Sequence, residues 1–169
     1  MSREEHRRYA PEMLGFAVIT VSDSRGPGED ASGDLVRELA AAAGHRVEHS
    51  ALVRDEAPAI GDVLSAMLAL PSVDVVVLTG GTGFSPRDVT LPAVAHLFDV
   101  PIEGFGELFR MLSFQQVGAA AMLSRAAAGV IGGRAVFLLP GSPKAVKLAM
   151  EALILPEAAH LLGQVRRKS

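Results

Sequence analysis

The sequence predicts an α/β domain in which helices cover both faces of a parallel sheet. Short apolar runs, partly β-branched, alternate along the chain with longer segments whose apolar residues recur at helical spacing. Loops rich in glycine, proline and aspartate separate these segments. With 169 residues, 49% of them hydrophobic, the chain suits one domain of ordinary size with a buried core.

Four apolar runs are predicted to be strands, because a strand that is covered on both faces lacks polar alternation. They span residues 15–22, 47–53, 73–78 and 135–139, and the run VDVVVL at 73–78 is the strongest.

Helices are predicted at residues 34–43, 57–70, 104–116 and 144–155, where apolar residues recur on one face. Gly44 stands where the first helix ends, and Pro58 and Pro71 bound the second. Thr90 is predicted to cap a further helix that carries Pro92 in its first turn.

Composition excludes several classes of protein. A net charge of −3 argues against a nucleic-acid or anionic-membrane surface, and the absence of cysteine excludes disulfides and thiolate zinc sites. Residues 1–13 are polar, unlike a signal peptide, and Ser124 and Arg125 interrupt the most apolar later stretch, so no membrane span is predicted. We therefore expect a cytoplasmic protein with a polar tail at 1–13, one domain at 14–165 and a solvated tail at 166–168.

The loops at 22–33, 80–90 and 140–144 are the candidate binding loops, because ligands of open parallel sheets bind beyond the carboxyl ends of the strands. The middle loop reads GGTGFSPRDVT. Its glycines, Gly80, Gly81 and Gly83, let backbone N–H groups approach an anion, and Thr82 adds a hydroxyl. It matches neither the Walker nor the dinucleotide motif, so a tight strand-to-helix turn is an equally good interpretation.

The third loop also has features of an anion site. Ser142 is predicted to be a helix N-cap, with Pro143 as the first helical residue. Lys144 then opposes the helix dipole at a cost of up to about 1 kcal/mol, a conflict that a bound anion would remove. The alternative is that Lys144 points into water.

Asp55 and Asp88 are the candidate metal ligands, because carboxylates beside a phosphate site usually hold Mg²⁺. The alternative for each is a helix N-cap. That alternative is stronger for Asp55, which precedes a predicted helix, than for Asp88, because Thr90 already serves as a cap. None of the five histidines is assigned a metal role, and no serine-hydrolase motif occurs.

The chain resembles the molybdenum cofactor biosynthesis proteins of the MogA/MoaB type, a family that includes a domain of gephyrin-like proteins. The resemblance is carried by ITVSDSRGPGEDASGD, GGTGFSPRDVT, EGFGELFRMLSFQQVG, AMLSRAAAGV and LPGSPKAV, which together extend over nearly the whole chain. It implies a three-layer αβα sandwich with a mostly parallel central sheet, the molybdopterin-binding fold.

The resemblance also implies an activity: transfer of AMP from ATP to the terminal phosphate of molybdopterin, with release of pyrophosphate. A partner of the MoeA type would then use the adenylylated pterin for metal insertion. Such a transfer is an in-line attack by a phosphate oxygen that is already ionised. It therefore requires positioning and charge neutralisation, not a strong general base.

The family's site residues carry over by resemblance. Asp55 and Asp88 match its catalytic aspartates and are expected to hold Mg²⁺. The pterin and its phosphate are expected near Thr20, Ser22, Ser124, Arg125 and Ser142, and the nucleotide near Gly80, Gly81, Thr82 and Gly83, with Gly141 and Lys144 completing the substrate site.

The segment EGFGELFRMLSFQQVG is closest to the MoaB branch, some members of which lack the aspartates and a clear activity. This chain retains both positions, so we expect an active enzyme. The branch implies a homo-oligomer, with a hexamer favoured over a trimer. Phe84, Phe105, Phe109 and Phe114 are candidate contact residues, although core packing accounts for most of them. The alternatives are a non-catalytic molybdopterin-binding carrier, a scaffold protein, or an ATP-binding enzyme of another pathway.

Overall fold

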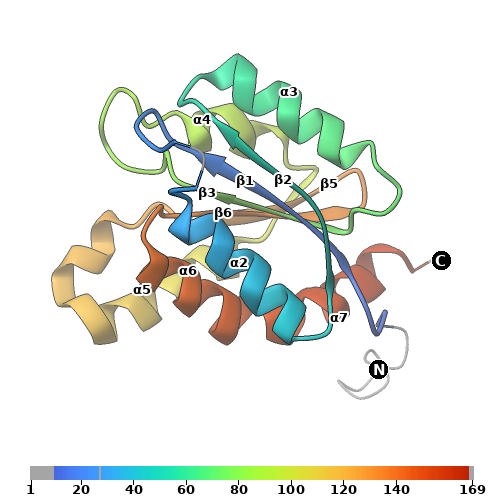
Figure 1. Ribbon diagram of the computed structural model, residues 1–169. Helices are drawn as coiled ribbons and strands as arrows, with labels where there is room; N and C mark the ends of the chain where they lie inside the picture. Colours follow the sequence, from blue (N-terminus) through green and yellow to red (C-terminus); the bar gives the residue numbers. More distant parts are fainter. Residues whose placement is uncertain (1–9, 27, 168–169) are drawn as a thin grey trace.

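The structure is a computed structural model that describes residues 10–26 and 28–167, and these form three layers (Figure 1). The described residues contain one six-stranded sheet. Its strand order is β2 (Arg46–Val53), β1 (Gly15–Val21), β3 (Val75–Thr79), β6 (Arg134–Leu139), β5 (Ala127–Ile131) and β4 (Val100–Pro101). Helices α3 (Ala57–Leu68) and α4 (Thr90–Val94) cover one face, and α2 (Ala31–Ala42), α5 (Glu103–Val117), α6 (Pro143–Ala149) and α7 (Leu155–Val165) cover the other (Figure 1). The predicted three-layer α/β fold is confirmed.

The two faces of the sheet bury alternate residues of the same strands. On β1, Phe16 and Val18 pack toward α2, α5 and α6, whereas Ala17 and Ile19 pack toward α3 and α4. The whole of β1 and β3 is buried. Their unbroken apolar runs follow from this burial, since both faces of each strand need apolar side chains.

The sheet is mixed, because β5 runs opposite to the other five described strands. β2, β1, β3 and β6 run parallel, whereas β5 pairs antiparallel with both β6 and β4. A tight turn joins β5 to β6 through Gly132 and Gly133, with φ of +54° and +77°, the paired positive φ angles of a type I′ hairpin. β4 and β5 were not predicted from the sequence, because VP is very short and AAGVI has few of the β-branched residues typical of a strand.

The predicted ends of α2 and α6 are observed, whereas the predicted start of α4 is not. Gly44 follows the end of α2 with a φ of +86°, and the Ser142 hydroxyl accepts from the backbone N–H of Ala145 as the predicted N-cap of α6. The prediction for Thr90 is wrong: Val89 is the N-cap residue of α4, and Thr90 is its first helical residue. The Thr90 hydroxyl instead donates to the carbonyl of Gly80 at 2.8 Å.

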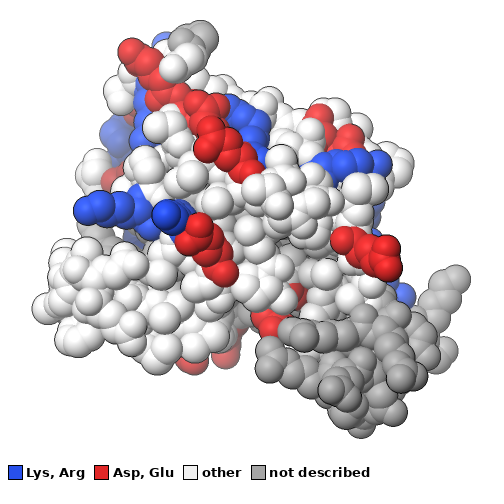
Figure 2. Space-filling model, turned by 60° about the horizontal axis from the view of Figure 1, so that its bottom comes forward, with Lys and Arg blue, Asp and Glu red and all other residues white. Residues whose placement is uncertain are grey.

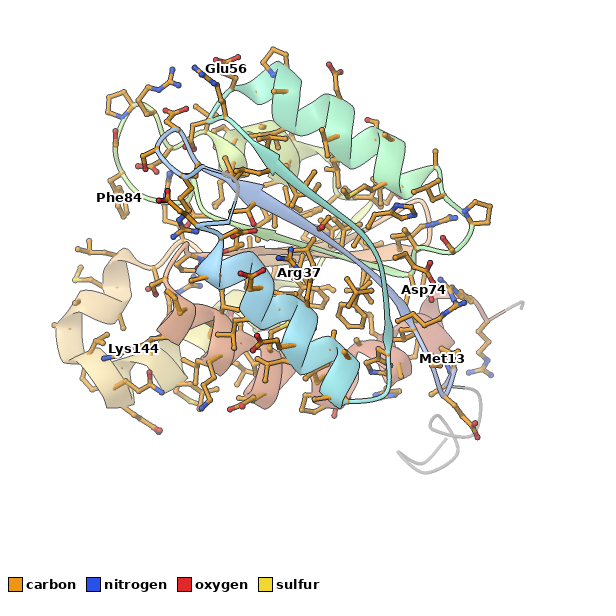
Figure 3. The ribbon with its side chains drawn as sticks, viewed as in Figure 1. Met13, Arg37, Glu56, Asp74, Phe84 and Lys144 are labelled. Atoms are coloured by element: carbon orange, nitrogen blue, oxygen red, sulfur yellow. The ribbon has the colours of Figure 1, made fainter. Side chains whose placement is uncertain are left out.

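The C-terminal helix continues beyond its predicted end at residue 155. A π-helical turn, η3 (Met150–Ile154), joins α6 to α7, and Pro156 lies in the first turn of α7. The wider turn accommodates a proline that has no N–H to donate. Arg166 pairs with Asp74 at 2.5 Å, so the predicted solvated tail is anchored at this residue (Asp74 is labelled in Figure 3).

Parts of two predicted tails lie outside the described residues: residues 1–9 of the N-terminal tail, and Lys168. In the part of the chain that the structure describes, no helix has the length and apolarity needed to cross a membrane.

Candidate functional site

Four parallel strands end at the same edge of the sheet and bring the three candidate loops together. The Ser22 N–H donates to the Val53 carbonyl at 2.8 Å, which joins the loops after β1 and β2. The Gly80 N–H donates to the Leu139 carbonyl at 3.0 Å, and the Thr79 hydroxyl donates to the Pro140 carbonyl at 3.1 Å. The candidate loops 22–33, 80–90 and 140–144 therefore lie together at this edge (left side of Figure 1).

The first two glycines of the middle loop have no room for a side chain. Gly80 and Gly81 have φ of +97° and +64°. A Cβ atom on Gly80 would lie 2.2 Å from the Val21 carbonyl oxygen, and one on Gly81 would lie 2.3 Å from Thr90 Oγ1 and 2.4 Å from Asp55 Oδ1. Thr90 holds the turn through both its backbone N–H and its hydroxyl. The loop is thus a tight turn, as the alternative interpretation held, and it also lines a cleft.

The cleft has two lobes. The glycine lobe, of about 670 Å³, is lined by Arg25, Gly80–Gly83, Asp88, Leu123–Arg125 and Pro140–Pro143. The helix lobe, of about 760 Å³, is lined by Phe109, Ser113, Gln116, Val117, Lys144, Ala145, Lys147, Leu148, Glu151 and Ala152. Ser124, Pro140 and Ser142 line both lobes, so the two spaces meet at these residues. Phe84, beyond the glycines, and Lys144, on α6, project from the same end of the molecule (Figure 3).

Arg125 holds the glycine loop from the opposite wall. Its Nε donates to the Thr82 carbonyl at 2.9 Å and its Nη2 to the Gly83 carbonyl. The guanidinium also lies 4.9 Å from the centre of the Phe84 ring, a cation–π distance. Arg125 therefore contributes positive charge to the cleft and fixes the shape of the loop that lines it.

The carboxylates of Asp23, Asp55 and Asp88 lie close together beside the glycine loop. Asp88 Oδ2 accepts from the Ser85 N–H at 2.9 Å, and Asp23 accepts from the Asp55 N–H at 3.1 Å. Burial, followed by the charges of Asp23 and Asp88, raises the pKa of the Asp55 carboxyl. The pKa of Asp23 is lowered, chiefly by its hydrogen bond from Arg87. This cluster therefore disfavours the ionised form of Asp55.

Asp55 is not a helix cap. The N-cap residue of α3 is Glu56, which makes no capping bond from its side chain. Asp55 Oδ1 is buried and has no hydrogen-bond partner. Neither is Asp88 a cap, since Val89 holds that position in α4. The capping alternative therefore fails for both aspartates. Asp88 lines the glycine lobe, whereas Asp55 lies against Gly81 on the other side of the loop.

Asp55 Oδ1 has no hydrogen-bond partner and two other carboxylates lie near it, an arrangement that suits a divalent cation. A cation would give the buried oxygen a partner and would offset the repulsion that raises its pKa. Within residues 10–26 and 28–167, no group of three or more His, Asp or Glu side chains is arranged to hold a metal by itself. Two carboxylates that share a hydrated ion with substrate phosphates match the usual mode of Mg²⁺ binding.

The loop after β1 positions its neighbours. Thr20 is fully buried, and its hydroxyl donates to Asp30 Oδ2 at 2.7 Å, so its side chain does not line the cleft. The Ser22 hydroxyl accepts from the N–H groups of Ser24 and Arg25 at 3.3 and 3.2 Å. Arg25 reaches across to donate to the Gly141 carbonyl at 2.9 Å. Thr20 and Ser22 thus shape this loop, and Arg25 carries its charge to the cleft.

The third loop presents its residues to different lobes. Gly141 lies close to the glycine loop, where an added Cβ atom would come 3.2 Å from the Gly80 Cα. Ser142 and Ser124 stand at the junction of the lobes. Lys144 is exposed and lines the helix lobe, not the glycine lobe. The structure therefore separates Lys144 from the glycines with which it was grouped by sequence.

Several lining residues escaped the sequence analysis. Arg25 lay in a predicted loop, but nothing in the sequence showed that it would cross to Gly141. Gln116 and Lys147 belong to α5 and α6, and their meeting depends on how these two helices pack. None of the histidines that the structure describes lines either lobe.

Comparisons with known proteins point to one family. The family model described as "Probable molybdopterin binding domain" matches residues 17–160. Molybdenum cofactor biosynthesis protein B of Bacillus cereus is 46% identical over 169 residues, which cover 99% of this chain and 100% of the relative. A crystal structure of a molybdenum cofactor biosynthesis protein B, also 46% identical, has a TM-score of 0.90 and covers 94% of this chain and 99% of its own. A structure from Thermus thermophilus, described as the molybdopterin biosynthesis enzyme MoaB, is 37% identical with a TM-score of 0.81, covering 92% of this chain and 98% of its own.

Proposed function

This chain belongs to the MoaB branch of the MogA/MoaB molybdopterin-binding family of molybdenum cofactor biosynthesis proteins, and from that membership we propose that it transfers AMP from ATP to the terminal phosphate of molybdopterin. The observation that carries the proposal is the glycine lobe. It combines the glycine loop, two arginines and Asp88 in one cleft, with the buried Asp55 oxygen directly behind the loop. Backbone N–H groups and guanidinium groups suit phosphates, and the carboxylates suit the cation that accompanies them.

In the proposed reaction, an oxygen of the molybdopterin phosphate attacks the α-phosphorus of ATP. A new phosphorus–oxygen bond forms while the bond between the α-phosphorus and the bridging oxygen breaks, and pyrophosphate leaves with that electron pair. The attacking phosphate is already ionised at neutral pH, so the reaction needs no strong general base. The chain's task is to align two anions and to offset their charge.

The residues that line the glycine lobe would align the two anions and offset their charge. Arg125 holds the carbonyls of Thr82 and Gly83, and the Gly80 N–H is bonded to the Leu139 carbonyl, so the N–H groups of Gly81, Thr82 and Gly83 are the ones that would bind the nucleotide phosphates. Arg25, fixed by its bond to Gly141, places a second positive charge on the opposite wall. Ser124 and Ser142 offer hydroxyls at the junction where the two phosphates would meet.

Asp55 and Asp88 are the residues that would hold Mg²⁺. Asp88 is oriented by the Ser85 N–H, and Asp55 has a buried oxygen without a partner. When bound, Mg²⁺ would supply positive charge to the nucleotide phosphates and to the leaving pyrophosphate. Because ATP is the proposed donor, we expect the protein to act in the cytoplasm.

The test is an assay of purified protein with molybdopterin, ATP and MgCl₂ that follows both adenylyl-molybdopterin and pyrophosphate. We expect product with the wild-type protein. Asp88→Ala should lower the rate at least about 100-fold, the usual cost of removing one group that stabilises a charged transition state. Asp62→Ala, which removes an exposed carboxylate from α3, is the matched control and should keep full activity. Binding of molybdopterin without any product would instead favour the non-catalytic carrier.

We further propose that the protein is a homo-oligomer, with a hexamer favoured over a trimer, and that it passes its product to a MoeA-type partner. Large apolar side chains are exposed on α5 and on the 3-10 segment η2 (Gly118–Leu123): Leu108, Met111, Phe114, Val117, Met122 and Leu123. Figure 2 shows a broad area without charged side chains at the lower left, on the side where these elements project in Figure 1. Of the four candidate phenylalanines, Phe105 and Phe109 are buried in the core, and Phe84 and Phe114 are exposed. Light scattering in solution would show the mass of six chains.

A further inference from the structure

We propose that the ion pair between Asp23 and Arg87 positions Asp55 and Asp88 for the cation, although neither member of the pair lines the glycine lobe. The two aspartates hold a cation only if the proposed function is correct, so this inference rests on that function. The role of the ion pair itself follows from contacts that join three loops.

The ion pair joins the loop after β1 to the glycine loop. Arg87 Nε donates to Asp23 Oδ2 at 2.9 Å, and Arg87 Nη2 lies 2.8 Å from the same oxygen. These two loops lie side by side at the upper left of Figure 1. Two charged N–H donors on one carboxylate oxygen hold the guanidinium in a defined orientation.

The other oxygen of Asp23 reaches the loop after β2. Asp23 Oδ1 accepts from the Asp55 N–H at 3.1 Å. This bond holds the backbone of Asp55, while the buried Asp55 Oδ1 has no hydrogen-bond partner. Asp23 therefore fixes the position of Asp55 and leaves that oxygen for a cation.

Arg87 directly precedes Asp88 in a short bonded turn. The Arg87 N–H donates to Ser85 Oγ at 3.2 Å, and the Asp88 N–H donates to the Ser85 carbonyl at 2.9 Å. Asp88 Oδ2 accepts from the Ser85 N–H at 2.9 Å. The bond from the Arg87 side chain to Asp23 therefore anchors the whole turn, and with it Asp88, relative to Asp55.

The alternative for Asp23 is that it is itself a metal ligand. Both of its oxygens already accept bonds, one from Asp55 and one from Arg87, and the guanidinium would repel a cation at the second oxygen. Within the described ranges 10–26 and 28–167, no three carboxylate or histidine side chains are arranged to hold a metal. Asp23 and Arg87 are therefore positioning residues.

The exposure of the pair separates positioning from folding stability. The Arg87 side chain is 61% exposed and that of Asp23 is 37% exposed. Exposed ion pairs add little to the stability of a folded protein. In contrast, residues that orient metal ligands change metal affinity about 10-fold to 100-fold. We therefore expect loss of this pair to weaken cation binding while the fold stays intact.

The test is calorimetry of ATP binding without molybdopterin, so that no turnover occurs. The Kd of ATP in EDTA divided by its Kd in MgCl₂ measures how much Mg²⁺ strengthens binding. Asp23→Ala and Arg87→Ala should each lower this ratio about tenfold. Arg87→Lys, which keeps one charged donor, should retain most of it. The double variant should lose no more than Asp23→Ala alone, because Arg87 acts through Asp23.

The control is Arg46→Ala, which breaks an exposed ion pair with Glu48 at the other end of β2. It should leave the ratio unchanged. The Tm of every variant should stay within about 4 °C of the wild-type value, because each loses only an exposed pair.

Arg87→Ala is the decisive variant, because charge and position predict opposite results. Removal of a positive charge near the cation would by itself strengthen Mg²⁺ binding. An unchanged or higher ratio in Arg87→Ala would therefore overturn the inference, as would a wild-type ratio of one. The proposed activity fails separately, if the wild-type protein shows the expected ratio and binds molybdopterin but forms no adenylyl-molybdopterin.

Discussion

Replacing Gly81 with alanine tests the geometry on which the candidate site depends. The added methyl group would lie 2.3 Å from Thr90 Oγ1 and 2.4 Å from Asp55 Oδ1. Real Cβ contacts essentially never fall below 3.0 Å, so the closest contact must open from 2.3 Å to at least 3.0 Å, a shift of 0.7 Å. Neither neighbour yields easily, because the Thr90 hydroxyl is bonded to Gly80 and Asp55 Oδ1 is buried.

The expected loss of stability has two parts. Gly81 has a φ of +64°, and a side chain in this left-handed region costs about 1–2 kcal/mol. Overpacking against Thr90 and Asp55 costs about 1–3 kcal/mol more. Gly44→Ala isolates the first part, because Gly44 has a φ of +86° and a Cβ atom there would meet nothing within 4 Å. Gly81→Ala should therefore destabilise the protein by about 2–5 kcal/mol, and Gly44→Ala by about 1–2 kcal/mol.

Urea unfolding of the two variants and of the wild-type protein measures this difference, and the adenylyl-transfer assay measures its consequence. A displacement approaching 1 Å within a catalytic loop lowers activity about 100-fold, so Gly81→Ala should lose activity while Gly44→Ala retains it. Equal destabilisation by the two substitutions would refute the close approach of Asp55 and Thr90 to the glycine loop. Full activity in Gly81→Ala would show that the glycine loop is not part of the active site.

Two further substitutions test the electrostatics of the glycine lobe. The pKa of Asp55 is raised, so the ionised carboxylate weakens folding at neutral pH, and this cost disappears as the pH falls toward the ordinary value of 3.8. In metal-free calorimetry, Asp55→Asn should thus raise Tm at pH 7, with a gain that shrinks toward pH 4. An equal gain at both pH values would contradict the assigned cause. Arg125→Lys keeps the charge but loses the paired bonds to Thr82 and Gly83, so urea unfolding should show a loss of about 1–3 kcal/mol. The KM for ATP should also rise, and unchanged values of both quantities would show that Arg125 does not hold the loop.

The parts of the fold that the sequence predicted are those set by local chemistry. VDVVVL at 73–78 predicts a buried strand because β3 is covered on both faces, and Ser142 with Pro143 predicts the start of α6 because capping depends on adjacent residues. β5 could not be predicted in the same way. Its sequence AAGVI has little strand preference, and its conformation is fixed by pairing with β6 across the Gly132–Gly133 turn.

The same distinction holds for the site. The rule that ligands bind at the carboxyl ends of parallel strands selected three loops that meet at one edge of the sheet, and parts of all three line one cleft. Which side chains face the cleft depends on contacts between distant parts of the chain. The hydrogen bond of Thr20 to Asp30 keeps its side chain out of the cleft, whereas the hydrogen bond of Arg25 to the Gly141 carbonyl holds its side chain at the cleft. Lys144 has the predicted position in its helix, yet it faces a second lobe whose other wall is α5.

The carboxylate cluster is more readily explained by ligand binding than by folding. Asp55 is partly desolvated, lies near two other carboxylates and has an oxygen without a partner, and these effects together oppose its charge more strongly than Arg87 favours it. A folded chain gains nothing from this arrangement without a cation, and perturbed carboxylates of this kind are typical of functional sites. If Asp55→Asn gives a protein that is more stable at neutral pH and at the same time inactive, the two results have one cause. The position is then retained for the charge that it presents to a metal ion and to the phosphates of ATP.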